Sequence, residues 1–219
     1  MILVLSVLEP EISPLVSEMV TFEQGTVFGR TFSRGVIGRN EVIAVSGIFG
    51  KVESAFFVQK ILDLYKINMI FLVSGAGALT EQIKPGEIVV GEAYQEFDRV
   101  IGLDCRTETI ISDIDVIQKL REDFPDIKSG KIISGDQIVN SKTERNQLFE
   151  KFRALALDMD SAAVAKVAKI NGIRFVSIKV ILDLCDENTQ KDYDAFFEKF
   201  SGRPAVLLSR FLEKHFCCT

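Results

Sequence analysis

Short apolar runs alternate along the chain with stretches that carry an apolar residue every three or four positions. A continuous run such as ILVLSVL is typical of a strand buried on both faces of a sheet. Runs of this kind predict strands at 1–8, 26–32, 34–38, 41–46, 69–73, 87–90 and 128–134. Helical spacing predicts helices at 11–20, 51–65, 113–123, 142–152 and 192–212, the last interrupted at 202–204. The polar, irregular segment 94–112 is predicted to be a mobile loop.

Residues 154–186 form the most informative stretch, which the pattern predicts as strand, helix and strand. The first strand leads into Asp158, Met159 and Asp160, and the second ends at Asp183. A carboxylate directly after an apolar strand is costly unless something uses it. In open α/β sheets, ligands bind outside the carboxyl ends of the strands. We therefore expect part of a binding site here.

Strands separated by helices over the whole length predict the α/β class. The expected architecture is a three-layer αβα domain whose central sheet is mixed and largely parallel. We find no internal repeat, low-complexity tract or linker among the 219 residues. A chain of this length is commonly one unit, so residues 1–219 are predicted to form a single domain.

Composition narrows the classes of partner. A net charge of −5 with interspersed charges gives no basic stripe, which argues against nucleic acid. The start of the chain has no positive segment before its apolar run, and the apolar segment 67–79 is interrupted by Asn68 and two glycines. We expect no membrane contact and a soluble, cytoplasmic protein.

The cysteines and the histidine do not indicate a metal site. The chain has four cysteines without CxxC spacing and one histidine, which makes zinc binding a poor interpretation. Cys217 and Cys218 are expected to be exposed thiols in a reducing compartment. His215 is expected to be solvated on the last helix.

Several groups that follow strands could carry chemistry, and each allows a simpler interpretation. Glu11 could be a first-turn helix residue favoured by the helix dipole. The glycine-rich segment SGAGA, 74–78, could serve packing alone. Met159 could fill the core or offer an apolar surface to a sugar. The segment SGDQIVN, 134–140, likewise follows a predicted strand, the one at 128–134.

Taken in order, these segments resemble the purine nucleoside phosphorylase/nucleosidase superfamily, and within it the 5′-methylthioadenosine/S-adenosylhomocysteine nucleosidases. The resemblance covers nearly the whole chain. It is carried by LEPEISPL, SGIFGKVESAF, VSGAGALTEQIKPGEIVVGEA, SGDQIVN, LDMDSAAVAKVA and IKVILDLCDE. Matches in the right order and at similar spacing are far more specific than any single motif.

The resemblance implies hydrolysis of the N-glycosidic bond of an adenine nucleoside, with methylthioadenosine or adenosylhomocysteine as substrate. Asp183 matches the family's general acid, which protonates a purine ring nitrogen so that adenine leaves neutral. Glu11 matches the residue that activates water on the opposite face of the sugar, as in an inverting glycosidase. No metal or organic cofactor is implied.

The resemblance also implies a sugar subsite. Met159 would lie against the ribose and Asp160 would bind its hydroxyl groups, although most family members have glutamate at this position. Tyr193 matches an aromatic residue over the ribose or the 5′ substituent. Ile48 and Phe49 lie in the turn that matches a segment near the sugar.

The resemblance also implies an adenine subsite, in which several residues differ from those of the family pattern. Ile138 and Val139 match positions that contact adenine, and Ile138 replaces an aromatic residue. The family's serine in the glycine-rich segment falls on Gly75, with Ser74 displaced by one position. Leu182 replaces the serine before the catalytic aspartate, which is expected to raise the pKa of Asp183 by desolvation.

Other functions stay open on the sequence alone. A phosphorylase would need a phosphate site, and the arginine expected before the glycine-rich segment is Leu72. A futalosine-type nucleosidase and a non-catalytic nucleoside-binding relative are further alternatives. The family implies a homodimer, and helix 51–65 is the candidate interface.

Overall fold

The computed structural model describes residues 1–99 and 107–215, and it confirms the alternation of strands and helices. The strands are β1 (Ile2–Ser6), β2 (Val20–Val27), β3 (Arg30–Ile37), β4 (Asn40–Ser46), β5 (Met69–Ala78), β6 (Ile88–Glu96), β7 (Ile110–Ile111), β8 (Lys128–Ser134), β9 (Ala156–Asp158) and β10 (Arg174–Asp183). The helices are α1 (Glu9–Glu18), α2 (Gly50–Leu64), α3 (Ile114–Asp123), α4 (Lys142–Phe152), α5 (Ser161–Ile170), α6 (Thr189–Phe200) and α7 (Arg203–Lys214).

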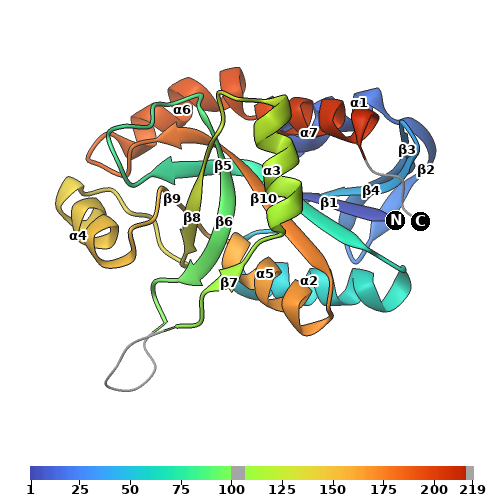
Figure 1. Ribbon diagram of the computed structural model, residues 1–219, viewed down its shortest axis with the longest axis horizontal. Coiled ribbons are helices and arrows are strands. Elements are labelled where there is room, and N and C mark those ends of the chain that lie inside the picture. Colours follow the sequence, from blue (N-terminus) through green and yellow to red (C-terminus); the bar gives the residue numbers. More distant parts are fainter. Residues whose placement is uncertain (100–106, 216–219) are drawn as a thin grey trace.

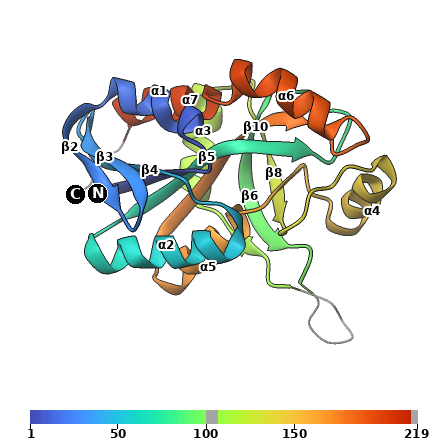
Figure 2. The same cartoon turned by 180° about the vertical axis from the view of Figure 1, so that it is seen from behind.

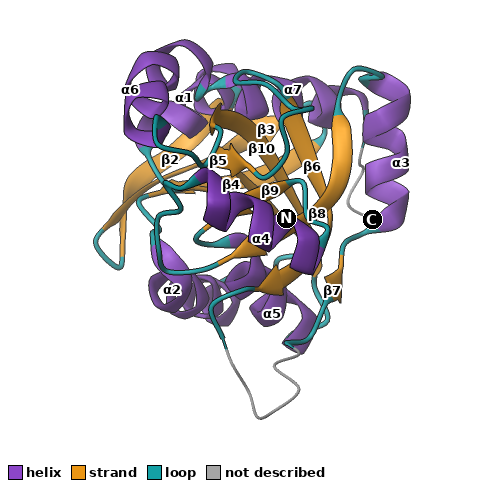
Figure 3. Cartoon of the chain, turned by 90° about the vertical axis from the view of Figure 1, so that its left-hand side faces the viewer, coloured by secondary structure: helices purple, strands orange, loops and turns teal. Residues whose placement is uncertain are grey.

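Helices cover both faces of the central sheet, which confirms the expected three-layer arrangement. Helices α1, α6 and α7 lie on one face, and α2 and α5 lie on the other (Figures 1 and 2). Helix α4 lies across one end of the sheet, and α3 lies beside β6 (Figure 3). The break predicted at 202–204 separates α6 from α7.

The sheet is mixed, and part of it closes on itself. Strand β1 pairs in parallel with β4 and β5, while β2, β3 and β4 form an antiparallel meander. The meander was predicted, but the strand predicted at 26–32 is wrong, because residues 28–29 form the turn between β2 and β3. Strand β10 pairs in parallel with β5 and antiparallel with β6. Since β6, β8, β9 and β5 are also paired in that order, these strands and β10 form a closed ring. The sequence pattern did not predict this closure.

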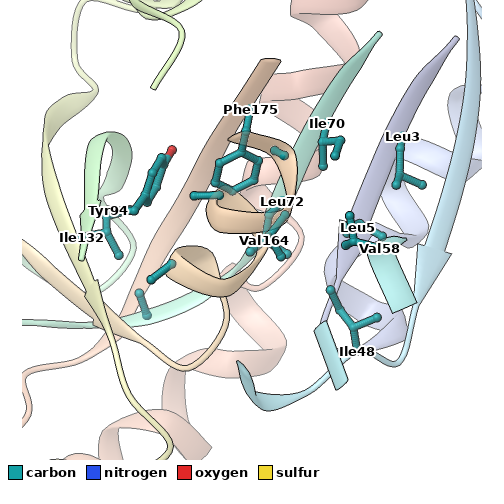
Figure 4. Close-up of a cluster of buried hydrophobic side chains, with 14 of the residues drawn as sticks. Leu3, Leu5, Ile48, Val58, Ile70, Leu72, Tyr94, Ile132, Val164 and Phe175 are labelled. Atoms are coloured by element: carbon teal, nitrogen blue, oxygen red, sulfur yellow. The ribbon is translucent and has the colours of Figure 1, made fainter. Parts of the chain in front are cut away.

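The core lies on both sides of β1, whose residues are all buried as predicted. Leu3 and Leu5 point toward the layer of α2 and α5, where Ile48 and Val58 pack beside them (Figure 4). The alternate residues of β1 belong to the cluster under α1 and α7. This division follows from the two-residue period of a strand, which sends successive side chains to opposite faces.

The predicted loop at 94–112 is wrong at residues 94–96 and 110–111, whereas residues 97–99 and 107–109 do lie outside the helices and strands. Strand β6 continues to Glu96, and residues 110–111 form β7. Tyr94 is completely buried, packs on the ring of Phe175, and accepts a hydrogen bond from the backbone N–H of Ser177. This buried contact holds the polar-looking segment in the sheet. Residues 100–106 of the predicted loop lie outside the described residues.

The expected solvation of His215 is also wrong. Its ring Nε2 lies 2.6 Å from Asp123 Oδ2, and its side chain is 24% exposed. Cys185 is free and buried, whereas Cys105, Cys217 and Cys218 lie outside the described residues. No helix in the described part of the chain is long and apolar enough to cross a membrane.

Asn40 anchors the end of α7, and its replacement tests this long-range contact. Its buried Nδ2 donates to the carbonyl oxygens of Leu212 at 2.7 Å and His215 at 3.0 Å. We expect Asn40→Ala to lower the free energy of unfolding by about 1–3 kcal/mol, because the buried carbonyl group of Leu212 and the partly buried one of His215 lose their donor. Urea denaturation measures this change. Asn171→Ala removes an exposed asparagine with two hydrogen bonds and should cost no more than about 0.5 kcal/mol; equal losses would contradict the role of Asn40.

Candidate active site

A cavity of 280 Å³ lies where β1, β5, β8, β9 and β10 end. Its volume is close to the lower end of the range typical of small-molecule sites, about 300–1,000 Å³. Residues expected to bind or react with substrate line it, namely Glu11, Phe49, Gly75, Ile138, Val139, Met159, Asp160, Asp183 and Tyr193. The structure thus brings together side chains from both ends of the chain.

The end of β5 explains why these strand ends converge. Gly77 pairs with Asp183 of β10 on one side and with Leu157 of β9 on the other. Strand β9 runs antiparallel to β5 and parallel to β8. The expectation that the site lies at the carboxyl ends of strands that all run in parallel is therefore wrong for β9. The segment SGAGA also belongs to β5 and is not a turn after the strand. Convergence therefore depends on the closed ring of strands.

Glu11 is buried and held by backbone donors on both carboxylate oxygens. Its Oε1 accepts from the N–H of Gly75 at 2.7 Å, and its Oε2 accepts from the N–H of Leu8 at 2.8 Å. Burial raises the pKa of Glu11, although these hydrogen bonds and the charge of Lys179 act in the opposite direction. Glu11 thus satisfies the first turn of α1 and also lines the cavity.

Asp183 is the last residue of β10 and is largely buried. Its Oδ1 accepts from the backbone N–H of Cys185 at 2.9 Å and lies 3.3 Å from the hydroxyl of Thr189. Burial raises the pKa of Asp183, against the effect of these donors. Burial and the nearby charges of Glu11 and Asp183 also raise the pKa of Tyr193 to about 12. A carboxyl group with a raised pKa suits proton donation near neutral pH.

Asp160 is anchored to the start of α2. Its Oδ1 accepts from the backbone N–H of Gly50 at 2.7 Å and from the hydroxyl of Ser54 at 3.3 Å. Burial, followed by the charge of Asp158, raises the pKa of Asp160 to about 7. One of its two carboxylate oxygens is therefore already bonded to the protein.

A buried ion pair, whose Asp158 lines the cavity, was missed in the sequence. Lys179 is completely buried within β10, and its Nζ lies 2.7 Å from Asp158 Oδ2. Asp158 also accepts from Ser134 at 2.5 Å and from the hydroxyl of Ser161. Burial would raise the pKa of Asp158, but the charge of Lys179 and these hydrogen bonds outweigh it and lower the pKa. A lysine inside an otherwise apolar strand was the signal that could have revealed the pair.

Two of the predicted site residues lie outside the cavity lining. Ile48 is completely buried and packs in the core beneath α2 (Figure 4). Ser74 is buried, and its hydroxyl accepts a hydrogen bond from Lys179 at 2.5 Å. Strand alternation explains the second case, since Ser74 points to the opposite side of β5 from Gly75.

Gly75 and Leu182 are sterically linked. A Cβ atom at position 75 would lie 2.3 Å from Leu182 Cδ1, so the leucine occupies the space that a side chain there would need. Leu182 lines the cavity, and so do residues that the sequence did not single out, among them Val7, Leu157, Cys185 and Thr189. The two departures from the family pattern thus compensate each other in volume.

The cavity mouth is apolar. Ile138 is 68% exposed and Phe49 is 56% exposed, whereas Val139 is buried. Tyr193 stacks on Phe197, with ring centroids 5.2 Å apart. Exposed apolar side chains at the rim of a small cavity suit a flat, partly apolar ligand.

A larger groove lies elsewhere but lacks comparable chemistry. It has a volume of 1210 Å³ and lies between α1, the end of α3, α6 and α7. Its Asp123 is already paired with Lys214 and His215. The buried carboxyl groups of Glu11, Asp160 and Asp183 all line the smaller cavity instead. Within the described residues, no group of three or more His, Cys, Asp or Glu side chains is arranged to hold a metal ion.

The fold is that of nucleoside phosphorylases, and comparison with known proteins identifies the family. The model described as "Phosphorylase superfamily" matches residues 1–213, and the chain belongs to that superfamily. It is 37% identical to the 5′-methylthioadenosine/S-adenosylhomocysteine nucleosidase of Thermotoga maritima, over 98% of this chain and 99% of the relative. These matches confirm the family indicated by the sequence motifs.

Two relatives from Helicobacter pylori extend the comparison. An aminodeoxyfutalosine nucleosidase is 26% identical over 96% of this chain and 97% of its own. The crystal structure of a 5′-methylthioadenosine/S-adenosylhomocysteine nucleosidase, complexed with an aminopyrrolopyrimidine compound, is 25% identical. It superposes with a TM-score of 0.89 over 98% of both chains. The relatives therefore include enzymes named for different nucleosides.

The raised pKa of Asp160 predicts a pH-dependent stability. Folding raises this pKa from 3.8 to about 7, so the folded state holds the proton more tightly than the unfolded chain. The resulting stabilisation is complete below about pH 4 and is lost as the pH rises to about 7. We expect Asp160→Asn to exceed the wild-type stability at pH 8 by on the order of 2–4 kcal/mol, with a smaller difference at pH 5.

Thermal or urea unfolding at pH 5 and pH 8 measures this difference. Asp136→Asn, at an exposed aspartate near the same helix terminus, is the matched control and should follow the wild-type pH dependence. If the wild-type protein and Asp160→Asn lost stability in parallel between these pH values, Asp160 would not be the responsible group.

Proposed function

We propose that this protein is a hydrolytic nucleosidase that cleaves the N-glycosidic bond of 5′-methylthioadenosine or S-adenosylhomocysteine and releases adenine. The observation that carries the proposal is the meeting of Glu11 and Asp183 in one cavity of 280 Å³. Both carboxyl groups are buried, both have raised pKa values, and both are oriented by backbone donors. Two such groups suit acid and base catalysis on one bond.

Asp183 is the proposed general acid. Its raised pKa keeps it protonated closer to neutral pH, and it transfers its proton to a ring nitrogen of the purine. The purine then leaves as a neutral base while positive charge develops on the sugar. The buried Val139 and the exposed Ile138 would contact the base, with Ile138 covering it at the cavity mouth.

Glu11 is the proposed base. It activates a water molecule that attacks the sugar carbon from the face opposite the leaving purine. A carboxylate with a raised pKa accepts a proton more readily than one with an ordinary pKa. Asp160 and Met159 would bind the ribose, Asp160 through the oxygen that α2 does not use, and Tyr193 would lie over the sugar.

The substrate assignment draws on relatives as well as on the cavity. The Thermotoga maritima relative, named for methylthioadenosine and adenosylhomocysteine, is 37% identical, whereas the aminodeoxyfutalosine nucleosidase is 26% identical. An aminodeoxyfutalosine-type nucleoside is the second candidate, because that relative also covers almost the whole chain. Phosphorolysis is less well supported, since Leu72 is completely buried in β5 at the position expected for a phosphate-binding arginine.

Adenine release tests the proposal directly. The purified protein should release adenine from methylthioadenosine at a rate that does not depend on phosphate. Asp183→Asn should lower kcat by a factor of about 100 to 10,000, because the amide cannot donate the catalytic proton. Liquid chromatography of the products measures both effects, and circular dichroism checks the fold.

The exposed aspartate variant Asp126→Asn, which lies away from both the cavity and α2, is the control and should keep its activity. No adenine from a folded wild-type protein with any adenine nucleoside would refute the enzyme assignment. Dependence on phosphate would instead favour a phosphorylase, and near-normal turnover by Asp183→Asn would exclude Asp183 as the acid.

We also propose that the protein is a homodimer joined through α2. Val52 and Phe56 on this helix are 79% and 57% exposed, and Phe28 and Phe49 are exposed nearby in the sheet turn and the cavity rim. An apolar surface of this kind on one helix suits a partner with the same surface. Since Phe49 also lines the cavity, such a partner would lie next to the substrate.

Light scattering tests the interface. The wild-type protein should have the mass of a dimer, and the double variant Val52→Glu/Phe56→Glu should have that of a monomer, because two charges would be buried at the interface. Ile114→Glu changes an equally exposed apolar residue on α3 and should leave the dimer intact. A monomeric wild-type protein would contradict the proposal.

A further inference from the structure

The first turn of α2 holds both segments that carry the proposed substrate subsites. Its first two backbone N–H groups belong to those that a helix leaves without an intrahelical partner. The N–H of Gly50 donates to Asp160 Oδ1 at 2.7 Å, and the N–H of Lys51 donates to Asp136 Oδ1 at 2.9 Å. Adjacent donors on one helix turn therefore hold Asp160, in the ribose subsite, and Asp136, two residues before Ile138 of the base subsite.

Gly50 is the residue that allows this double approach. Its φ of 75° lies in the left-handed region that favours glycine. A Cβ atom at this position would lie 3.2 Å from Asp136 Oδ1, which is closer than most such contacts. The absence of a side chain at the start of α2 therefore leaves room for the Asp136 carboxylate.

The side chain of Lys51 extends the contact to the end of β6. Its Nζ lies 2.6 Å from Asp98 Oδ1 and 3.2 Å from Glu96 Oε1. The other oxygen of Asp98, Oδ2, accepts from the backbone N–H of Asp136 at 2.9 Å. Lys51, Asp98 and Asp136 thus form a closed cycle of hydrogen bonds, which we call the Lys51 cluster. Within it, Asp136 is held through both its backbone and its side chain.

The Lys51 cluster is charged and only partly exposed. The side chains of Lys51 and Asp98 are 16% and 21% exposed. Burial would lower the pKa of Lys51, but its hydrogen bonds to Asp98 and Glu96 outweigh this effect and raise the pKa. Burial would raise the pKa of Asp98, but the hydrogen bonds from Lys51 and from the N–H of Asp136 lower it. Both groups therefore stay ionised at neutral pH, and their hydrogen bonds belong to the stronger, charge-assisted kind.

We propose that Lys51 is a positioning residue, which through Asp98 and Asp136 fixes the base subsite relative to the ribose subsite. This inference rests on the proposed function and its subsites. Residues 135–141 belong to no helix or strand, so the side chains that would contact the base depend on contacts such as those of Asp136. The proposed acid and base are held by backbone donors outside the cluster. The cluster should therefore govern substrate binding more than the chemical step.

A ligand that spans both subsites should depend on the Lys51 cluster, whereas a ligand that fills one of them should not. Methylthioadenosine would occupy the base and ribose subsites together, so its binding requires them at the correct separation. Adenine would occupy the base subsite alone, and a shift of that whole subsite would leave its contacts intact. Comparison of the two ligands therefore separates a positioning role from general damage to the cavity.

The kinetics of Lys51→Met test the first consequence, because methionine keeps an unbranched side chain without the charge. We expect KM for methylthioadenosine to rise about tenfold and kcat to change by less than about threefold. Lys51→Arg keeps a positive charge and should bring KM to within about threefold of the wild-type value. Lys119→Met, at an exposed lysine of α3, is the matched control and should keep wild-type kinetics. A loss confined to kcat, or an unchanged KM, would overturn the inference.

Binding measured in the Asp183→Asn background does not need turnover. By isothermal titration calorimetry, Lys51→Met should raise the Kd of methylthioadenosine about tenfold and that of adenine by less than about twofold. Asp98→Ala breaks the cluster from the other side and should act in the same direction. Combined with Lys51→Met it should add little further loss, because both changes remove the same interaction. Equal weakening of the two ligands, or additive effects of the two substitutions, would contradict the positioning role.

The outcomes separate this inference from the proposed function. A folded wild-type protein that binds methylthioadenosine without releasing adenine would refute the nucleosidase, and the binding measurements would still decide the role of Lys51. A wild-type protein that binds neither ligand would refute both. An active wild-type protein whose Lys51→Met and Asp98→Ala variants bind both ligands normally would refute only the positioning role. Circular dichroism and light scattering check the fold and the oligomeric state of each variant, and Asp98→Ala supplies the measurement if Lys51→Met does not fold.

Discussion

The pairing of β5 with strands on both sides is the constraint on which the rest of the structure depends. At Gly77, β5 meets Asp183 of β10 on one edge and Leu157 of β9 on the other. This arrangement closes the ring of strands and brings Asp183 beside the segment that carries Met159 and Asp160. The residue at the junction is glycine because Cys185 and Asp183 occupy the space above it. Gly77 therefore takes part in the pairing that closes the ring of strands and also lies beside the carboxyl group of Asp183.

Electrostatics explains how acidic residues from distant segments can share this region. Asp158 is fully paired with the buried Lys179, which lowers its pKa and keeps it ionised beneath the cavity. Asp160, without such a partner, has its pKa raised to about 7 by burial and by the charge of Asp158. Like charges in one desolvated region are separated in this way into different protonation states. Asp158 thus stays ionised, whereas Asp160 can bind a proton near neutral pH.

Departures from the family pattern at the site form a consistent set. Leu182 occupies the volume above Gly75, so the loss of a side chain at one position accompanies a larger one at the other. Cys185 donates its backbone N–H to the carboxyl group of Asp183, beside which Leu182 has no polar side-chain group. The left-handed backbone of Cys185 shows that local conformational strain is accepted around this carboxyl group. Changes of this kind leave the carboxyl group of Asp183 in place while altering the surface around it.

The sequence by itself determined the secondary-structure alternation, the family, and the candidate acid and base, because apolar runs and ordered motifs are local properties. It also indicated that Glu11 and Asp183 follow strands. Only the tertiary structure decided that Ile48 and Ser74 lie outside the cavity lining, since periodicity predicts burial without saying what a side chain contacts.

The roles of Lys179 and Tyr94 were hidden from the sequence for a similar reason. A lysine in an apolar strand and a tyrosine in a polar segment acquire their roles from Asp158 and Ser177, which lie on other segments of the chain. Closure of the strand ring was equally hidden, because pairing between β10 and both β5 and β6 depends on long-range geometry that no local pattern encodes.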